Sequence, residues 1–236
     1  MDRQITKGTK IVLEPVNDSA DLTEPLFAIN WFNTRANWLY NLYNLIAASS
    51  VFQVGAAPFF KGHVTETLLG SADASRQLLL IVNYPSGEKF LDLLSGRYFQ
   101  VTSVLRMAAV KNFSFVLNAR VDGPTLMKSR KQQFDASHGW AVHHYSSSQD
   151  MNDELEQLRQ VTAQSGISLH FASVRAATVH SEDREAKRTP MNTITDRVVL
   201  LSASTPQKLT AAIRGPYSEF ADSVQNSYIG TLARVM

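Results

Sequence analysis

Apolar runs and helical spacings alternate along the chain in an order that occurs twice. In the first half, strands are predicted where residues are continuously apolar or alternate with polar ones, at 26–32, 59–69, 78–84 and 113–121. Helices are predicted where apolar residues recur three and four positions apart, at 35–54 and after Pro85, with a break at Gly96. The order is strand, helix, strand, strand, helix, strand, the split βαβ or ferredoxin-like pattern.

The apolar positions of these two helices form stripes that we expect to belong to the core. In the first helix the stripe consists of Trp38, Leu42, Leu45, Ile46 and Phe52. In the second it consists of Phe90, Leu93, Leu94, Tyr98, Val101, Val104 and Leu105. The aromatic residues around the first strand and helix, Trp31, Trp38, Tyr40 and Tyr43, form either core or the wall of an aromatic pocket.

The second half repeats the order of elements. Strands are predicted at 140–145, 167–179, 198–204 and 228–235, and helices at 151–164 and 206–224. Three points align between the halves: Tyr84-Pro85 with Thr205-Pro206, Gly96-x-Tyr98 with Gly215-x-Tyr217, and Ala119-Arg120-Val121 with Ala233-Arg234-Val235. The chain is therefore predicted to be a tandem duplication of fold class α+β.

The repeats divide the chain into four parts. Residues 1–24 are an N-terminal arm whose apolar run at 11–13 packs on the domain or on a neighbouring subunit. Residues 25–123 are the first ferredoxin-like unit, 124–138 a polar linker, and 139–236 the second unit. Within the second unit, the charged segment 181–195 is predicted to be a mobile loop.

Composition narrows the classes of protein that remain. With 236 residues, 44% of them hydrophobic and 19% charged, the chain can bury a core. A net charge of +2 without a basic cluster argues against nucleic-acid binding. The absence of cysteine excludes disulfides, Cys-ligated metals and thiol nucleophiles. No apolar run approaches a membrane span and the first residues lack an apolar signal region, so a cytoplasmic location is expected.

Polar residues inside otherwise apolar strands are the first candidates for a site. Asn30, Asn83 and Asn118 fall on strands that are neighbours in a ferredoxin-like sheet, whose strand order is 4-1-3-2. His144 and Ser204 are the second-half counterparts of Asn30 and Asn83. An unpaired buried amide costs about 1–3 kcal/mol, so these groups either face a ligand as a row or bond to backbone near strand ends.

Arg106 and the histidines are the remaining candidates. Arg106 either binds an anion or carbonyl of a ligand or is a cation at a helix C-terminus. The histidines lack the spacing of a metal site, and the adjacent His143 and His144 point to opposite faces of a strand. His170 is either a lone haem ligand or a hydrogen-bonded histidine. No metal and no cofactor are predicted, since glycine-rich nucleotide motifs are also missing.

The duplicated order of elements resembles the dimeric α/β-barrel superfamily. The resemblance implies two ferredoxin-like units packed sheet against sheet around a cavity, here within one chain. Within it, Tyr84-Pro85, Phe90, Tyr98 and Arg106-x-x-Ala109 resemble a bacterial domain family of unknown function over residues 26–122. The second half has no counterpart of Arg106 and is about five residues shorter after Tyr217, so a ligand site is expected in the first half.

That superfamily includes cofactor-free monooxygenases, polyketide cyclases, haem-dependent chlorite dismutases and plain binding proteins, so the fold does not decide the function. We predict an α/β-barrel protein that binds a small, largely apolar molecule. If it is an enzyme, we expect cofactor-independent isomerisation, cyclisation or oxygenation. The alternatives are a non-catalytic protein-interaction module and a haem-binding protein that uses His170 or His144; a homodimer is left open.

The residues assigned to the predicted site come from both halves of the chain. His144 is the candidate general base, and Arg106, Asn30 and Asn83 polarise a carbonyl. The remaining ligand-binding candidates are Asn118, Trp31, Tyr98 and Ser204.

Overall fold

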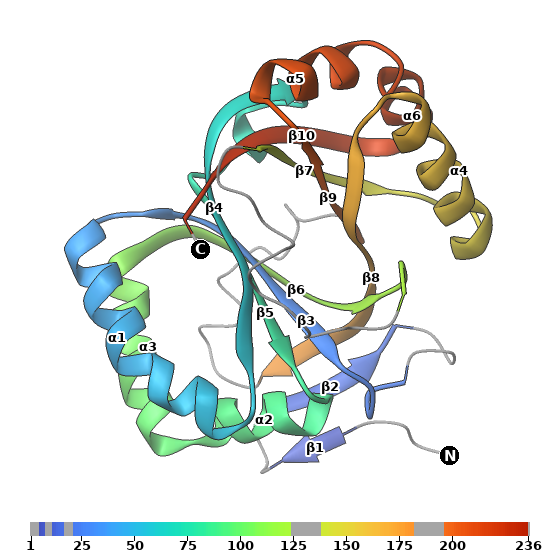
Figure 1. The fold of residues 1–236 in the computed structure, drawn as a ribbon. Helices are drawn as coiled ribbons and strands as arrows, with labels where there is room; N and C mark the ends of the chain where they lie inside the picture. The colour runs from blue at the N-terminus through green and yellow to red at the C-terminus, as the bar shows by residue number, and fades with distance from the viewer. Residues whose placement is uncertain (1–4, 8–10, 17–20, 124–137, 182–195, 236) are drawn as a thin grey trace. The chain divides into compact units, whose positions relative to one another are not determined.

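The computed structural model describes residues 5–7, 11–16, 21–123, 138–181 and 196–235, and it confirms the α+β class (Figure 1). The strands are β1 (Ile5–Lys7), β2 (Ile11–Pro15), β3 (Leu26–Thr34), β4 (Ala57–Leu69), β5 (Leu78–Tyr84), β6 (Val110–Arg120), β7 (Gly139–Ser146), β8 (Ser168–Ser181), β9 (Arg197–Ala203) and β10 (Gln225–Arg234). The helices are α1 (Asn37–Gln53), α2 (Gly87–Ser95), α3 (Arg97–Ala109), α4 (Met151–Gln164), α5 (Pro206–Arg214) and α6 (Ser218–Ser223), with a short 3-10 turn, η1 (Ala72–Ala74). No helix in these ranges is long and apolar enough to cross a membrane.

Side-chain caps begin three of the helices. The Ser86 hydroxyl accepts a hydrogen bond from the Lys89 backbone N–H at the start of α2. The Thr205 hydroxyl accepts one from the Lys208 backbone N–H at the start of α5. The Asp150 carboxylate accepts from the Asn152 backbone N–H at the start of α4. Such caps satisfy backbone donors that have no partner inside the helix. Serine, threonine and aspartate therefore place these helix starts where the sequence predicts them.

A glycine breaks the second helical segment in both halves. Gly96 separates α2 from α3, as predicted. In the second half a single helix over 206–224 was predicted, and this is wrong: Gly215 leaves the helical conformation, with φ −107° and ψ −116°, and separates α5 from α6. A side chain there would bring a Cβ to 3.0 Å from the Ala211 carbonyl oxygen. The close approach of the backbone explains why a glycine stands at this break.

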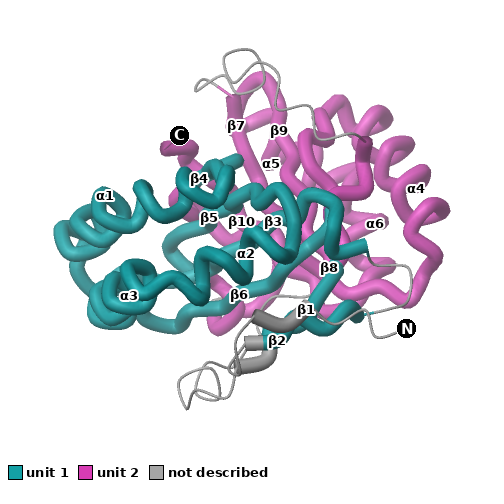
Figure 2. The backbone as a smooth tube through the Cα atoms, turned by 90° about the horizontal axis from the view of Figure 1, so that it is seen from below, with its two compact units in different colours: residues 1–61, 76–119, 175–193 teal, residues 62–75, 120–174, 194–236 magenta. Residues whose placement is uncertain are grey.

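The chain forms two compact units, which Figure 2 shows in different colours. The first unit comprises residues 1–61, 76–119 and 175–193, and the second comprises 62–75, 120–174 and 194–236. Both β4 and β8 therefore contribute residues to each unit. The linker predicted at 124–138 lies outside the described residues except for His138, and the predicted loop at 181–195 lies outside them except for Ser181.

Each unit contains its own set of neighbouring strands. In the first unit the order is β1-β2-β8-β6-β3-β5-β4, and in the second it is β4-β10-β7-β9-β8. The central strands β3 and β7 pair antiparallel with their neighbours, β3 with β5 and β6 and β7 with β9 and β10. If the four strands that belong to each half of the chain are numbered one to four, both halves have the order 4-1-3-2.

Helices cover one face of each sheet. In the first unit, α2 and α3 bury Phe90, Leu91, Leu93 and Phe99 against strand residues that include Leu26, Val82 and Leu117. In the second unit, α4, α5 and α6 pack on alternate residues of β7 and β9 such as Ala141, Val199 and Leu201. Because strand side chains alternate between faces, these packed residues determine which side of the sheet every other strand residue faces.

Of the residues predicted to be helical core, Phe90 and Leu93 of α2 are buried as predicted, but most of those on α1 and α3 are exposed. On α1 the buried residues are Tyr40, Ala47 and Ser50, while Trp38 and Leu45 are 70% and 76% exposed. On α3 the buried residues are Phe99, Thr102 and Ala109, while Val101 is 72% exposed. The spacing correctly predicts helices, but it predicts the wrong buried face, because both helices are apolar on more than one side.

Part of the N-terminal arm belongs to the core of the first unit. β2 pairs antiparallel with the last residues of β8, and Leu13 is fully buried among the residues under α2. The Gly87 backbone N–H donates to the Leu22 carbonyl oxygen at 2.8 Å, which ties the arm to the start of α2.

We expect Leu13→Ala to lower the free energy of unfolding by about 2–5 kcal/mol, the usual cost of truncating a buried leucine. Val16→Ala is the control: Val16 is 49% exposed, and a change there should stay within about 0.5 kcal/mol. Urea denaturation followed by circular dichroism measures both. Equal effects of the two substitutions would mean that the arm contributes little to the core.

Candidate functional site

The side of the first unit's sheet that faces away from the helices carries two buried asparagines. Val82 and Tyr84 of β5 pack with the helices, so Asn83 between them points to the opposite side. Leu117 of β6 likewise packs with the helices, so Asn118 shares that opposite side. Both residues are buried: Asn118 is fully buried and Asn83 is 6% exposed. Two of the three predicted asparagines therefore lie on one face.

Phe27 of β3 lies between these asparagines. It pairs in register with Asn83 on one side and with Asn118 on the other. The Phe27 ring is fully buried and meets the Phe59 ring edge to face, with centroids 5.4 Å apart. We call Asn83, Phe27 and Asn118 the asparagine row. It places amide groups on both sides of an aromatic ring, on the side of the sheet that the helices leave uncovered.

The amide of Asn83 has an unsatisfied donor. Its Nδ2 is buried and makes no hydrogen bond to any described residue. A buried donor without an acceptor costs about 1–3 kcal/mol, and native proteins satisfy nearly all such groups. This donor is therefore the polar group of the row that is best suited to bind the acceptor oxygen of a ligand.

Asn30 does not extend the row. It alternates with Ile29 and Trp31 and lies on the helix-covered side together with Ala28. Its Nδ2 donates to the carbonyl oxygens of Ala28 and Leu80 at 3.2 and 3.1 Å. Of the two interpretations of these asparagines, the backbone-bonded one therefore applies to Asn30. The expectation that all three asparagines form one row is corrected.

Arg106 also lies on the helix-covered side. Its guanidinium is 4.9 Å from the centroid of the Phe113 ring, and Phe113 packs with Phe32 and Tyr40. The positive charge of Arg106 counteracts part of the rise that burial imposes on the pKa of Tyr43. These contacts place Arg106 in a cation–π interaction with structural aromatics. The expectation that it points to the same space as Asn83 is corrected.

The remaining candidates, Trp31, Tyr98 and Ser204, lie in different places. Trp31 is buried and shares the side of the sheet with Phe27. Tyr98 is 54% exposed on α3, and its hydroxyl donates to the Ile46 carbonyl oxygen at 3.4 Å. Ser204 of the second half follows β9 and is exposed. Trp31 can therefore be grouped with the asparagine row, whereas Tyr98 belongs to the helix surface.

In the second unit, His144 lies against an aromatic residue that the sequence did not single out. The His144 ring stacks on the Tyr228 ring, with centroids 4.8 Å apart and an interplanar angle of 20°. The Tyr228 hydroxyl is 3.1 Å from both the Thr67 and the Ser75 hydroxyl oxygens. Tyr228 pairs with His144 across β10 and β7. No residue near either of them in the sequence indicates this pairing, which becomes visible only when the register of the two strands is known.

His143 lies on the opposite, helix-covered face, which confirms the predicted divergence of the two adjacent histidines. Its Nδ1 is 2.9 Å from the Tyr217 hydroxyl, and its Nε2 is 2.8 Å from the Ser227 hydroxyl. Burial lowers the pKa of His143 well below 6.5, and the neighbouring His144 lowers it further. His143 is therefore a neutral, doubly hydrogen-bonded core residue.

His170 does not fit an axial haem ligand. Its Nε2 is 2.7 Å from the Ser202 hydroxyl, and its ring lies 4.7 Å from that of Trp140. Burial is the main cause that lowers the pKa of His170 to about 4, so the ring is neutral near pH 7. A metal bound at Nε2 would displace the serine. Within the described ranges, no group of three or more His, Asp or Glu side chains could hold a metal ion.

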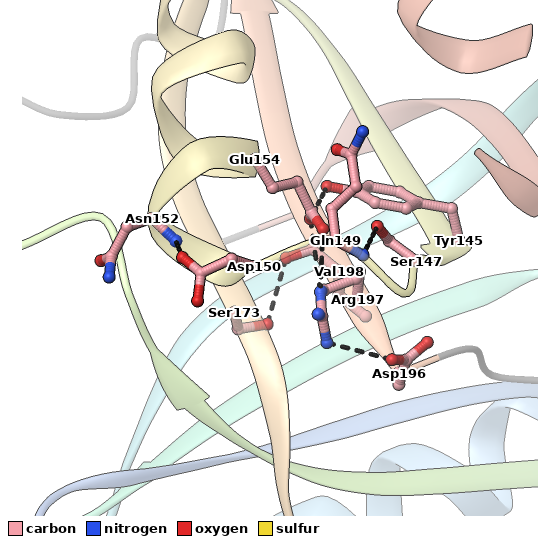
Figure 3. A network of polar contacts seen from close by, with 10 residues as sticks. All are labelled: Tyr145, Ser147, Gln149, Asp150, Asn152, Glu154, Ser173, Asp196, Arg197 and Val198. Atoms are coloured by element: carbon pink, nitrogen blue, oxygen red, sulfur yellow. Dashed lines mark hydrogen bonds and ion pairs between the residues drawn. The ribbon is translucent and has the colours of Figure 1, made fainter. Parts of the chain in front are cut away.

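A buried ionic network in the second unit attaches α4 to β7 and β9 (Figure 3). The Tyr145 hydroxyl donates to Glu154 Oε1 at 2.7 Å, and Arg197 Nε lies 3.3 Å from the same carboxylate. Arg197 also donates to Asp196 at 3.0 Å. Glu154 is fully buried in the first turns of α4, where the helix dipole also favours a negative charge. The carboxylate has its partners, so the network is structural.

The chain is similar in fold to solved structures. No family model and no curated protein matches it. An anthrone oxidase-like protein matches 95% of this chain and 94% of its own, with 13% identity and a TM-score of 0.53. A candidate monooxygenase from Fusobacterium nucleatum matches 92% and 94%, with 7% identity and a TM-score of 0.52. A candidate chlorite dismutase matches 89% and 95%, with 8% identity and a TM-score of 0.51.

At these identities the likeness shows a shared fold and nothing about the reaction. It confirms that the chain resembles the dimeric α/β-barrel proteins in fold, as the duplicated order of elements implied.

Removing the buried carboxylate should test the structural role of the network. We expect Glu154→Ala to lower the free energy of unfolding by about 3–5 kcal/mol, because it deprives a buried arginine of its partner. Glu156→Ala is the control on the same helix: its side chain is 77% exposed, and the expected change is within about 0.5 kcal/mol. Urea denaturation of both variants measures these changes. A free energy of unfolding in Glu154→Ala that falls by no more than in Glu156→Ala would contradict the structural role.

His143 should make stability depend on pH. The unfolded histidine takes up a proton near pH 6.5, but the buried one resists protonation, so stability is full above pH 6.5 and falls as the pH decreases. At pH 5 the loss is at most about 2 kcal/mol for this residue. We expect His143→Asn to flatten the decline in unfolding free energy between pH 7 and pH 5. His63→Asn, at an exposed position, should leave the slope unchanged, and equal slopes in all three proteins would refute the assignment.

Proposed function

We propose that this protein binds a small, largely apolar organic molecule that carries a carbonyl or similar acceptor, on the helix-free side of the first unit's sheet. The observation that carries the proposal is the buried Asn83 Nδ2 without an acceptor among the described residues. A ligand carbonyl at this position would satisfy the donor and recover the cost of burying it. Asn118, across Phe27, lies close enough in register to bind the same ligand.

The apolar part of the ligand is inferred from the neighbours of the asparagine row. Phe27 and Phe59 meet edge to face beside the amides, and Trp31 lies on the same side of β3. Aromatic surfaces of this kind contribute most of the binding energy in small-molecule sites, while a few polar groups determine orientation. We therefore expect a planar or aromatic ketone to bind better than a charged or sugar-like molecule.

We also propose that residues 25–123 and 139–236 are two ferredoxin-like units that together form an α/β barrel within one chain. The strand order 4-1-3-2 in both halves supports this, as does the fold shared with three solved structures. A small-molecule ligand is the partner this arrangement suits. A cytoplasmic location, a second copy of the chain as a partner, and the absence of nucleic-acid and membrane partners stay predictions.

For an enzyme, we propose cofactor-independent chemistry on a carbon next to the bound carbonyl. Asn83 would polarise the carbonyl and make the neighbouring C–H more acidic. His144, which belongs to the second unit, stays a prediction as the general base. Isomerisation is the simplest case, since the proton removed from one carbon is returned to another. Cyclisation uses the same activated carbon, and oxygenation would in addition require molecular oxygen as the co-substrate that oxidises it. The alternatives are a binding protein without catalysis and a haem protein. The hydrogen bond between Ser202 and Nε2 of His170 argues against His170 as the haem ligand, and His144 stays the other predicted ligand.

Anthrone and 9,10-dihydroanthracene, which has the same ring skeleton without the carbonyl, test the proposal by titration with fluorescence detection. We expect anthrone to bind at least tenfold more tightly to the native protein. Asn83→Leu should remove this preference and leave the free energy of unfolding unchanged or about 1–3 kcal/mol higher, because it removes an unsatisfied buried donor.

Asn30→Leu is the matched control for this experiment. It removes an amide that is bonded to two backbone carbonyls, so it should lower stability while the preference for anthrone persists. Equal affinities of the native protein for anthrone and 9,10-dihydroanthracene would refute the role of Asn83. An affinity for anthrone that is unchanged in Asn83→Leu would also refute it.

A further inference from the structure

Helices α1 and α3 expose an unusual number of large apolar side chains. On α1 these are Trp38, Leu42, Leu45 and Phe52, and on α3 they are Tyr98, Val101, Val104 and Met107. We call these eight residues the α1–α3 face. On α1 they recur at spacings of four, three and seven, so they line one side of the helix. On α3 they lie three apart, so the row winds around the helix from Tyr98 to Met107. These are largely the positions that the sequence predicted to be buried.

The two stripes lie on neighbouring helices of the same unit. Figure 1 shows α1 and α3 side by side, running in opposite directions. The Arg35 backbone N–H at the start of α1 donates to the Ala109 carbonyl oxygen at the end of α3, at 2.8 Å. Near the start of α3, the Tyr98 hydroxyl donates to the Ile46 carbonyl oxygen of α1. The stripes therefore form one surface rather than two separate patches.

Charge is almost absent from this surface. The 17 residues of α1 include no Asp, Glu, Lys or Arg, and the charged residues of α3 are Arg97 and Arg106, of which Arg106 lies over Phe113. A surface helix normally has a charged outer side, and one that is apolar all round is normally buried. The corresponding helix of the second half, α4, has the ordinary pattern, with exposed Asp153, Glu156 and Arg159.

The area of the face matches that of a stable interface. The exposed fractions of its residues lie between 36% and 76%, which for large side chains amounts to roughly 700 Å² of apolar surface. The largest patch on a typical monomer is about 300–600 Å². A standard interface buries about 800 Å² on each partner.

We propose that the α1–α3 face binds the same face of a second copy of this chain, in a twofold symmetric dimer held by helix packing. An uncharged, apolar surface is complementary to itself, and twofold dimers are the commonest assemblies. A membrane is the weaker alternative, because helices that lie on membranes are rich in Lys and Arg on their polar side, and neither helix contains a lysine. The inference does not depend on the ligand proposed above.

Sedimentation equilibrium of the full chain tests the proposal. The native protein should sediment at twice the monomer mass of 26.2 kDa. The double variant Leu45→Glu/Val101→Glu should weaken dimerisation at least 100-fold, because it buries two charges on each side of the contact. Circular dichroism should show the native fold in this variant. Val235→Glu is the control, since Val235 is 50% exposed in the other unit, and it should leave the dimer intact.

Three results would overturn the proposal. The first is a native protein that stays monomeric at about 100 μM, roughly the weakest affinity expected of a specific interface of this size. The second is a double variant that dimerises as tightly as the native protein. The third is a monomer that cosediments with phosphatidylcholine vesicles and loses this binding in the double variant, which would assign the face to a membrane instead.

Discussion

The alternation of side chains across a strand decides which residues of this protein can act together. A strand residue faces one of two sides, and here the helices occupy one side of each sheet. Residues at odd and even positions of one strand therefore point to opposite faces of the sheet and cannot contact the same ligand. Asn83 and Asn118 can serve one ligand because both pair with Phe27. Asn30 pairs with Leu80 and cannot join them.

The same constraint places two adjacent histidines in different surroundings. His143 and His144 are adjacent, yet one is enclosed by Tyr217 and Ser227 under the helices and the other stacks on Tyr228. Burial with two hydroxyl partners keeps His143 neutral and removes it from acid–base chemistry near pH 7. His144 lies on the helix-free side of its own unit, where it stacks on Tyr228 instead of joining the hydrogen bonds under the helices.

Much of the fold was predictable from the sequence because its signals are local. Apolar runs, capping residues and glycine breaks located the strands β3 to β10 and most helices to within a few residues, but not β1 and β2 in the N-terminal arm. The site was harder, because register between distant strands determines which side chains meet. Nothing near Tyr228 indicates that it pairs with His144. Glu154 could have been recognised, since it occupies a position on the apolar stripe of α4, but its partner Arg197 is 43 residues away.

The orientation of the helices could not be predicted for a different reason. The spacing of apolar residues identifies the buried side of a helix only when the other side is polar. In α1 and α3 both sides carry apolar residues. The two halves of the chain illustrate this: Tyr98 and Tyr217 align in the sequence, but Tyr98 is 54% exposed on α3, whereas Tyr217 is fully buried against His143. In the second half the tyrosine contributes to the unit's own core. In the first half it has become part of an apolar surface, which the fold itself does not require, because α4 shows that an equivalent helix packs well with a charged outer side. The apolar outer side of α1 and α3 is therefore best explained by a selected interaction with something outside the unit.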